Sequence, residues 1–204
     1  MKKIRILIAD DHALMRLGLK SMITLQPDME VVGEAENGQD AIESAAALLP
    51  DIVIMDLMMP KVNGADATKT ICEANSEANV IILTSYGDAA DLSRAVANGA
   101  VGVQMKDAPT EELLTAIRNV MAGGTAIASE FREQCETNLP ALTKKQSDIL
   151  ESVARGYANK DIAKQFGISE VGVKKHLRRI FAKLGAANRS EAVGIALKKQ
   201  LLKI

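Results

Sequence analysis

The chain is poor in cysteine and in aromatic residues, and each shortage excludes a class of protein. Its two cysteines, Cys72 and Cys135, are too few for a disulfide framework and lack the spacing of metal ligands. Aromatic residues make up only 2% of the sequence, which argues against a protein that stacks single-stranded bases. No apolar run approaches the ~20 residues of a membrane span, and the N-terminal run is too short for a signal peptide. We therefore expect a cytoplasmic protein without a membrane partner.

Neither sign of charge dominates the whole chain, whose net charge is −1, but its two parts differ strongly. Residues 141–204 hold 14 Lys and Arg against 5 Asp and Glu, a net of +9. Residues 1–140 hold 11 Lys and Arg against 21 Asp and Glu, a net of −10. Such asymmetry predicts two domains with different partners. The acidic part would attract metal ions, and the basic part a polyanion such as nucleic acid.

Apolar runs and helical periodicities alternate through the first 123 residues. The predicted strands are Ile4–Ala9, Val31–Ala35, Ile52–Met55, Val80–Leu83 and Val101–Met105. The predicted helices that follow them in turn are 14–25, Gly38–Leu49, Ala65–Ala74, Ala89–Ala97 and Glu111–Met121. This alternation with short loops is typical of an α/β fold in which a five-stranded parallel sheet is doubly wound, as in flavodoxin.

The rest of the chain predicts a linker and a small all-α domain. Residues 124–140 show no sustained periodicity and end in Pro140, so we predict domains at 1–123 and 141–204 joined by a linker at 124–140. The expected helices are one between Thr143 as its cap and Gly156, Lys160–Phe166 capped by Asn159, Glu170–Leu184 capped by Ser169, and Glu191–Leu202 capped by Ser190. The middle pair, a short helix followed by a glycine-containing turn and a longer basic helix, follows the helix-turn-helix pattern.

Polar residues follow four of the predicted strands, at the edge where the carboxyl ends of parallel strands meet. Asp10 and Asp11 follow the first strand, Asp56 the third, Thr84 the fourth and Lys106 the fifth. Taken alone, Asp56 is equally well explained as a cap of the next helix. The convergence of carboxylates, a hydroxyl and an ammonium group favours a functional site instead.

Crowded carboxylates raise one another's pKa, and a divalent cation relieves that conflict. Mg²⁺ prefers one or two carboxylates together with waters and phosphate oxygens, while a lysine neutralises a phosphoryl oxygen. A carboxylate beside Mg²⁺ and Lys106 is therefore suited to attack phosphorus and form an aspartyl phosphate. Because the third strand is central in the expected strand order, Asp56 is the predicted nucleophile.

Several motifs resemble known families. The segments "IADDH", "DIVIMDLMMPKVNG", "IILTSY" and "VQMKD" resemble the receiver domain of bacterial response regulators, and the sequence from "LTKKQSDIL" to "NRSEAV" resembles the LuxR-type helix-turn-helix. Together they are similar to NarL/FixJ-class response regulators over nearly the whole chain. The resemblance implies a phosphorylation-controlled transcription regulator, not an enzyme, in which Asp56 accepts a phosphoryl group from a sensor histidine kinase.

The same resemblance implies roles for the other residues at the strand ends. Asp10, Asp11, Asp56 and the backbone carbonyl of Met58 would form the Mg²⁺ site. Thr84 would be the switching hydroxyl and Lys106 the phosphate-binding lysine. One position departs from the pattern, because Val103 stands where receivers often place an aromatic switch residue. The signal would then pass through Thr84 and the loop that follows it.

The basic helix 170–184 is the predicted DNA-binding element. Its apolar stripe consists of Val173, Leu177, Ile180, Phe181 and Leu184. The resemblance implies that Lys174, Lys175 and Arg178 reach base edges, where such side chains recognise guanine. The residues expected at phosphates of double-stranded DNA are Arg179, Lys160 and Lys183, with His176 at most a phosphate contact. A solvated lysine-rich face is the alternative interpretation.

Two further features of the basic domain bear on its use. Gly172 replaces a threonine that commonly precedes the "VK" of the recognition helix, and it lowers helix propensity by roughly 1 kcal/mol relative to alanine. The helix Glu191–Leu202 offers an apolar seam that includes Leu197 and Leu201. Because such a seam can pack against a second copy, we expect the phosphorylated protein to pair as a homodimer on a two-fold DNA site.

Three other functions stay open from the sequence. A haloacid-dehalogenase-type phosphohydrolase also uses a strand-ending aspartate with Mg²⁺, but it needs a second aspartate where Met58 stands. A flavodoxin-like cofactor-binding protein needs a hydroxyl- and glycine-rich loop where Asp10 and Asp11 would repel a phosphate. A DNA-binding protein whose first domain is never phosphorylated is disfavoured by the complete set of acids, hydroxyl and lysine.

Overall fold

A parallel β-sheet forms the centre of the N-terminal α/β domain. The computed structural model describes residues 2–75, 78–85, 89–128, 131, 142, 144–199 and 201–202. Its strands are β1 (Ile4–Ala9), β2 (Met29–Ala35), β3 (Ile52–Asp56), β4 (Asn79–Thr84), β5 (Gly102–Met105) and β6 (Ala126–Ile127). They pair in parallel in the order β2-β1-β3-β4-β5-β6. The carboxyl ends of β1, β3, β4 and β5 therefore lie together at one edge, with β3 central.

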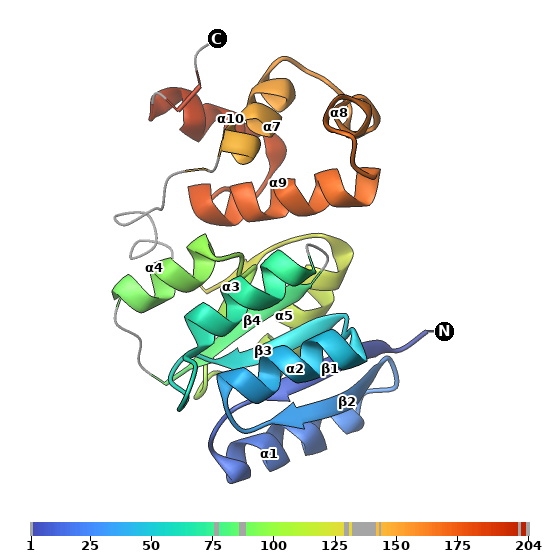
Figure 1. Cartoon of the computed structure of the whole chain (residues 1–204), viewed down its shortest axis with the longest axis vertical. Helices are drawn as coiled ribbons and strands as arrows, with labels where there is room; N and C mark the ends of the chain where they lie inside the picture. Colours follow the sequence, from blue (N-terminus) through green and yellow to red (C-terminus); the bar gives the residue numbers. More distant parts are fainter. Residues whose placement is uncertain are drawn as a thin grey trace.

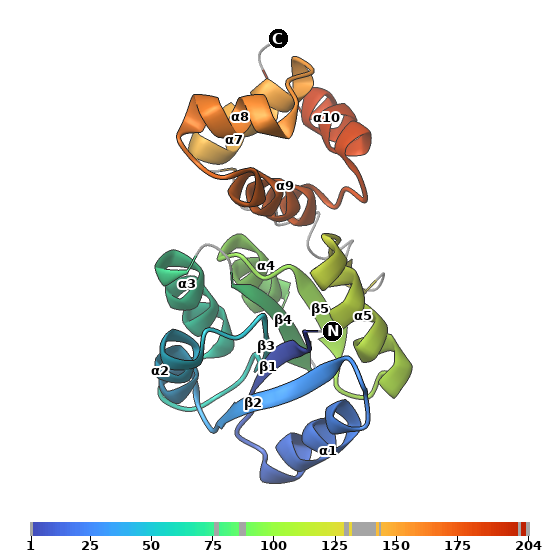
Figure 2. The same cartoon turned by 90° about the vertical axis from the view of Figure 1, so that its right-hand side faces the viewer.

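Helices cover both faces of this sheet (Figures 1 and 2). They are α1 (Ala13–Thr24), α2 (Gly38–Leu48), α3 (Gly64–Ala74), α4 (Ala89–Ala97) and α5 (Thr110–Ala122). On one face α2, α3 and α4 bury residues such as Ala41, Ile71 and Leu92. On the other face α1 and α5 bury Ile23 and Ile117. Strands buried on both faces carry continuous apolar runs, and the doubly wound α/β fold predicted from those runs is confirmed.

The sheet has one strand more than the five predicted. The additional strand, β6, lies beside β5 with Ala126 opposite Gly102, within the segment predicted to be a linker. The Gln104 side chain donates a hydrogen bond to the Ala126 carbonyl at 3.0 Å. A strand of two residues is too short to show a period of two. Pairing with β5, and not a local pattern, makes this segment a strand.

The C-terminal domain is helical, as predicted. Its helices are α7 (Lys144–Ala154), α8 (Asn159–Phe166), α9 (Glu170–Leu184) and α10 (Arg189–Lys198). They share a core of their own, which includes Ile149, Ile162, Val173, Ile180 and Ala192. Ser169 caps α9 as predicted, because its hydroxyl accepts a hydrogen bond from the Gly172 backbone at 3.0 Å. Gly185 ends α9 in the left-handed region, with φ of 68°.

Two predicted helix starts in this domain are wrong by one or two residues. Ala158 takes the cap position of α8, because the Asn159 side chain instead accepts a hydrogen bond from Arg189 at 3.2 Å. Asn188 caps α10 by accepting from the Glu191 backbone at 3.0 Å, so Ser190 lies inside the first turn. This helix ends at Lys198 and not at Leu202. The predicted cap Thr143 lies outside the described residues.

The two domains meet through α9, the helix of the C-terminal domain that lies nearest the α/β domain in Figures 1 and 2. Arg178 Nη1 donates to Asn79 Oδ1 at 3.4 Å, and Arg179 lies beside Cys72 and Gly99. Asn79 begins β4 and Gly99 precedes β5, so α9 contacts the edge that holds the amino ends of the strands. The acids and the lysine predicted to be functional lie at the opposite edge. Among the described residues, no helix has the length and apolar character needed to cross a membrane.

Candidate functional site

The carboxyl edge of the sheet brings together the side chains that the sequence placed there. Asp56 is the last residue of β3, Asp10 directly follows β1, and Thr84 ends the neighbouring β4. Lys106 directly follows β5. Asp10 is 1% exposed and Asp56 4% exposed. Buried carboxylates of this kind need a partner to offset their loss of hydration.

Lys106 supplies that partner to both buried acids. Its Nζ lies 2.7 Å from Asp10 Oδ2 and 2.9 Å from Asp56 Oδ2, and its side chain is only 9% exposed. Burial alone would lower the pKa of Lys106, but its hydrogen bonds and charge interactions with Asp10 and Asp56 together raise that pKa. The lysine is therefore held in its charged form, and its ammonium group contacts Asp56, the predicted nucleophile.

The ionised form of Asp56 is still disfavoured in spite of this ion pair. Burial raises the pKa of Asp56 above its ordinary value, and the charge of Asp10 raises it further, while Lys106 acts in the opposite direction. The Met58 backbone amide also donates to Asp56 Oδ1, at a long 3.4 Å. One lysine thus balances two buried carboxylates only in part, and a further cation would favour the ionised form of Asp56.

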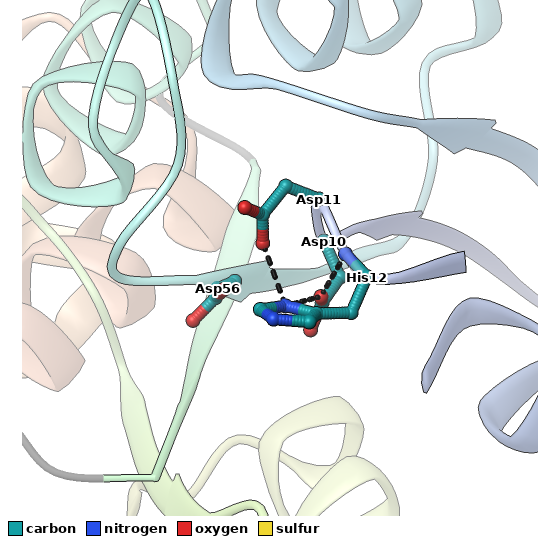
Figure 3. A group of neighbouring side chains, drawn as sticks. All are labelled: Asp10, Asp11, His12 and Asp56. Carbon is teal, nitrogen blue, oxygen red and sulfur yellow. Dashed lines mark hydrogen bonds and ion pairs between the residues drawn. The ribbon is translucent and has the colours of Figure 1, made fainter. Parts of the chain in front are cut away.

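The acidic group extends to Asp11 and His12, and its donor atoms suit a divalent cation. Figure 3 shows the side chains of Asp10, Asp11, His12 and Asp56 facing one another, and a ligand atom from each lies within 4.8 Å of the others. Carboxylate oxygens at this density are the ligands that Mg²⁺ prefers. Asp11 keeps 34% of its side chain exposed, which leaves the site open to solvent and to a phosphoryl donor. The residues present therefore fit Mg²⁺.

His12 is the member of this group that the sequence analysis missed. It occupies the cap position of α1, where a histidine is ordinary, but its side chain caps nothing. Instead its Nδ1 lies 2.8 Å from Asp11 Oδ1 and 3.3 Å from Asp10 Oδ1. The available signal was the position of His12 directly after the acid pair in "DDH".

Thr84 and Met58 lie beside the acids in different surroundings. Thr84 is 1% exposed, and its carbonyl accepts a hydrogen bond from the Lys106 backbone at 2.8 Å. Met58 belongs to the loop after β3, and its side chain is exposed. Gly64 closes this loop, since a Cβ atom there would lie 2.0 Å from the Asp56 carbonyl oxygen. Only glycine permits so close an approach, which folds the loop over Asp56.

The second candidate site is the basic surface of α9. The predicted base-reading residue Lys174 is exposed, and Lys175 and Arg178 are partly buried. Arg178 bends toward the α/β domain, where a Cβ atom at Gly123 would lie 2.9 Å from its Nη2. Burial lowers the pKa of Arg178, and its Nε is buried without a partner among the described residues. An arginine that the sequence predicts to read DNA bases is thus desolvated at the domain interface.

The residues predicted at DNA phosphates fall into different environments. Lys160 is exposed on α8. Lys183, by contrast, is 3% exposed and donates to Gln146 Oε1 at 2.9 Å. Arg179 and His176 are partly buried where α9 faces the other domain. In this arrangement Lys183 is held inside the protein, while Lys160 is open to solvent.

Comparison with known families identifies the two parts of the chain. Residues 6–118 match the response regulator receiver domain, and residues 140–196 match the LuxR family of bacterial regulatory proteins. The chain is a response regulator of the NarL/FixJ class. The acidic edge of this response regulator lies in the receiver, and α8 and α9 are the helix-turn-helix of its LuxR-type domain.

Relatives of this response regulator match it along its length. It is 39% identical to the oxygen regulatory protein NreC of Staphylococcus haemolyticus, over 97% of this chain and 99% of NreC. It is 33% identical to the solved structure of the response regulator ChrA from a heme-sensing two-component system, with a TM-score of 0.57 over 99% of this chain and 100% of ChrA. The NarL receiver domain of Mycobacterium tuberculosis is 30% identical, with a TM-score of 0.58 over 60% of this chain and 99% of that domain. The predicted family, fold class and two-component function are confirmed.

Proposed function

We propose that this response regulator is switched by transfer of a phosphoryl group from a sensor histidine kinase to Asp56. The observation that carries the proposal is the contact of Lys106 with both Asp10 and Asp56 at the carboxyl edge of the sheet. In this proposal the receiver spans residues 1–123, the linker 124–140 and the DNA-binding domain 141–204, and the protein acts in the cytoplasm.

The chemistry follows from the arrangement of these side chains. A carboxylate oxygen of Asp56 attacks phosphorus, the new O–P bond forms as the N–P bond of the phosphohistidine breaks, and the imidazole nitrogen keeps the electron pair. Lys106 neutralises one phosphoryl oxygen, and the Thr84 hydroxyl donates to another. A bound Mg²⁺ would supply positive charge that offsets the crowded carboxylates and the phosphoryl group. Asp10, Asp11, Asp56 and the Met58 carbonyl would hold it.

In this proposal, phosphorylation of Asp56 controls whether α9 of the helix-turn-helix is free to bind DNA. In the arrangement described above, α9 faces the receiver, and a helix in that position cannot enter a major groove at the same time. The desolvated Arg178 weakens this closed arrangement, because a buried donor without a partner costs about 1–3 kcal/mol. A modest change at the receiver can therefore shift the population toward an open form. Freed domains would pair through α10, which exposes Leu197, and through the segment after it, where Leu201 is exposed.

Mass measurement tests the acceptor directly. Wild-type protein incubated with phosphoramidate and Mg²⁺ is expected to gain the mass of one phosphoryl group, whereas Asp56→Asn gains none. Chelation of the metal should prevent labelling of the wild type. A matched control is Asp51→Asn, since Asp51 lies at the amino end of the same strand and is expected to leave labelling intact. Labelling of Asp56→Asn, or labelling that ignores the chelator, would show that the acceptor or the metal is misassigned.

Alanine substitution on α9 tests the division of DNA contacts. Replacing Lys174, Lys175 or Arg178 is expected to cost about 1–3 kcal/mol on the cognate site and little on random DNA. Replacing Arg179 should weaken all sequences alike and lower the salt slope by about one. Binding of phosphorylated protein to a site recovered from genomic fragments gives both quantities. Equal losses on cognate and random DNA for all of these variants would remove the distinction.

A further inference from the structure

A cleft of about 340 Å³ lies where the DNA-binding domain meets the receiver. Helix α9 forms one wall, and α3 with the loop after α4 forms the other. The titratable side chains that line it include Lys69 and Glu73 from α3, Lys145 from α7, and His176, Arg179 and Lys183 from α9. The cleft therefore draws its charged groups from both domains.

Positive charge in this cleft exceeds negative charge. Four side chains of lysine and arginine line it against the single carboxylate of Glu73, which is exposed at the rim. Among the residues that the structure describes, no carboxylate lies within ion-pair distance of Lys69, Lys145, Arg179 or Lys183. Arg179 Nη2 is buried and has no hydrogen-bond partner within that part of the chain. A guanidinium group in this state strongly favours an anion.

Burial and the same excess of positive charge lower the pKa values of His176 and Lys183. Burial lowers the pKa of His176, and the charges of Lys145 and Arg179 lower it further. Burial likewise lowers the pKa of Lys183, with Arg179 adding to the effect. The charges that lower these two pKa values all belong to the DNA-binding domain, so that domain's wall of the cleft carries an excess of positive charge.

The size and lining of the cleft limit which ligands it can bind. Its volume is at the low end for small-molecule sites, and four of the side chains that line it are lysine or arginine. A DNA duplex cannot enter while the receiver covers α9. A small oxyanion with more than one negative charge fits within this volume, and a phosphate offers several acceptor oxygens to surrounding cations.

We propose that this interdomain cleft binds a small multivalent oxyanion of the phosphate class, bridging Lys69 of the receiver to Arg179 and Lys145 of the DNA-binding domain. Bound there, the anion holds the domains closed and occupies Arg179, the residue assigned to a DNA phosphate. It acts as an inhibitor of DNA binding that adds to the control by Asp56. This role rests on the proposed function, but binding of the anion does not.

Calorimetric titration of the unphosphorylated full chain with inorganic phosphate tests the site without DNA. The titration is made in the presence of a chelator, so that no divalent cation recruits phosphate to Asp56, and potassium chloride keeps the ionic strength constant. One saturable site per chain is expected. Lys69→Gln should weaken it about two- to five-fold, the range for loss of one partly exposed charge. Lys3→Gln makes the same change of charge at an exposed residue outside the cleft and should leave the affinity unchanged.

A second measurement separates binding from its effect. At constant ionic strength, phosphate should lower the affinity of the wild type for DNA more than that of Lys69→Gln. No saturable phosphate binding, or equal binding by wild type and Lys69→Gln, would overturn the site. Saturable binding with no differential effect on DNA would overturn the bridging role. Neither result bears on Asp56, whose labelling is measured by mass.

Discussion

Lys106 is the residue on which the receiver site depends most, because it is the cation that balances two buried carboxylates. Its Nζ contacts Asp10 and Asp56 at 2.7 and 2.9 Å, and each of these acids is at most 5% exposed at its side chain. Removing one member of a buried charge cluster leaves the others unpaired, which is costlier than losing an exposed ion pair.

Replacing Lys106 with methionine is therefore expected to lower the free energy of unfolding by about 3–5 kcal/mol in the presence of a chelator. Added Mg²⁺ should restore part of that loss, because the ion supplies positive charge to the same carboxylates. Urea denaturation gives both values. The control is Lys20→Met, whose partner Glu34 lies 2.7 Å away but whose exposed pair is worth about 0–1 kcal/mol. Similar costs for the two variants would contradict this account of the site.

At the scale of single residues, the sequence predicted the acids and the lysine but not every neighbour. Asp10, Asp56 and Lys106 were predictable because residues that end parallel strands meet at one edge. His12 was not, because a histidine at a helix start is ordinary and the direction of its ring depends on tertiary contacts. The burial of Lys183 was hidden for a similar reason, since its partner Gln146 lies 37 residues away in the chain.

At the scale of elements, β4 joins the two functional regions. Thr84 ends this strand at the acidic edge, and Asn79 begins it at the edge that contacts α9. The two residues are ~17 Å apart along an extended strand. Asn79 also donates from its side chain to the Asp51 carbonyl at 2.9 Å, which fixes its acceptor oxygen toward Arg178. If contact between the Thr84 hydroxyl and a phosphoryl group shifts β4, that shift would also move Asn79 and change its hydrogen bond with Arg178.

Substitutions at Asn79 are expected to move DNA binding in opposite directions. Asn79→Ala removes the acceptor for Arg178, so the unphosphorylated protein should bind DNA about two- to five-fold more tightly, as expected for one weak hydrogen bond. Asn79→Asp retains an acceptor and adds charge, so it should stabilise the closed form and weaken binding. Gel-shift titration of both variants measures the effect. A change of the same sign in both would rule out this contact as a restraint on α9.

Helix α9 also carries a pH-sensitive group at the interface. His176 faces Lys145 of α7, Arg179 and Lys183 of its own helix, and Lys69 and Glu73 of α3 around one cleft. Burial and the charges of Lys145 and Arg179 lower the pKa of His176 from its ordinary value of 6.5. Below that value the unfolded chain takes up a proton that the folded chain resists, so the free energy of unfolding falls as the pH falls. Above it the histidine contributes no pH dependence.

Urea denaturation of wild type and His176→Gln tests this sign. Glutamine does not titrate, and the other histidine, His12, is present in both proteins, so its contribution cancels in the difference. Relative to the variant, the wild type should lose stability between pH 7.5 and pH 5.5. A difference between the two proteins that is the same at both values would contradict the environment assigned to His176.

Local sequence patterns predict most helices and strands of this chain, but not those that depend on contacts with distant residues. Most helices and strands were predicted within one or two residues, with β1 and α9 matched at both ends, but α10 ends at Lys198, four residues before the predicted end. Strand β6 was missed, because two residues become a strand only by pairing with β5. The start of α10 was misplaced because asparagine and serine are both good caps, and only the fold shows that Asn188 reaches the Glu191 amide.

At the scale of the whole molecule, an acidic receiver and a basic DNA-binding domain face each other through α9. Their opposite net charges were visible in the sequence, but the surface that each domain uses was not. The structure places α9 on the amino edge of the sheet, while Asp56, the proposed phosphoacceptor, lies on the carboxyl edge. In the proposed function, phosphorylation would therefore act on DNA binding across the sheet and not by direct contact between Asp56 and α9.

The measurement that tests this account most directly is the DNA affinity of the full chain before and after treatment with phosphoramidate and Mg²⁺, compared with Asp56→Asn under the same conditions. The DNA is a site recovered from genomic fragments that the phosphorylated protein retains. The account predicts that phosphorylation strengthens binding by wild type and leaves Asp56→Asn at the level of the untreated protein. Equal affinity of wild type with and without the phosphoryl group would contradict it, because α9 would then be free whatever the state of Asp56.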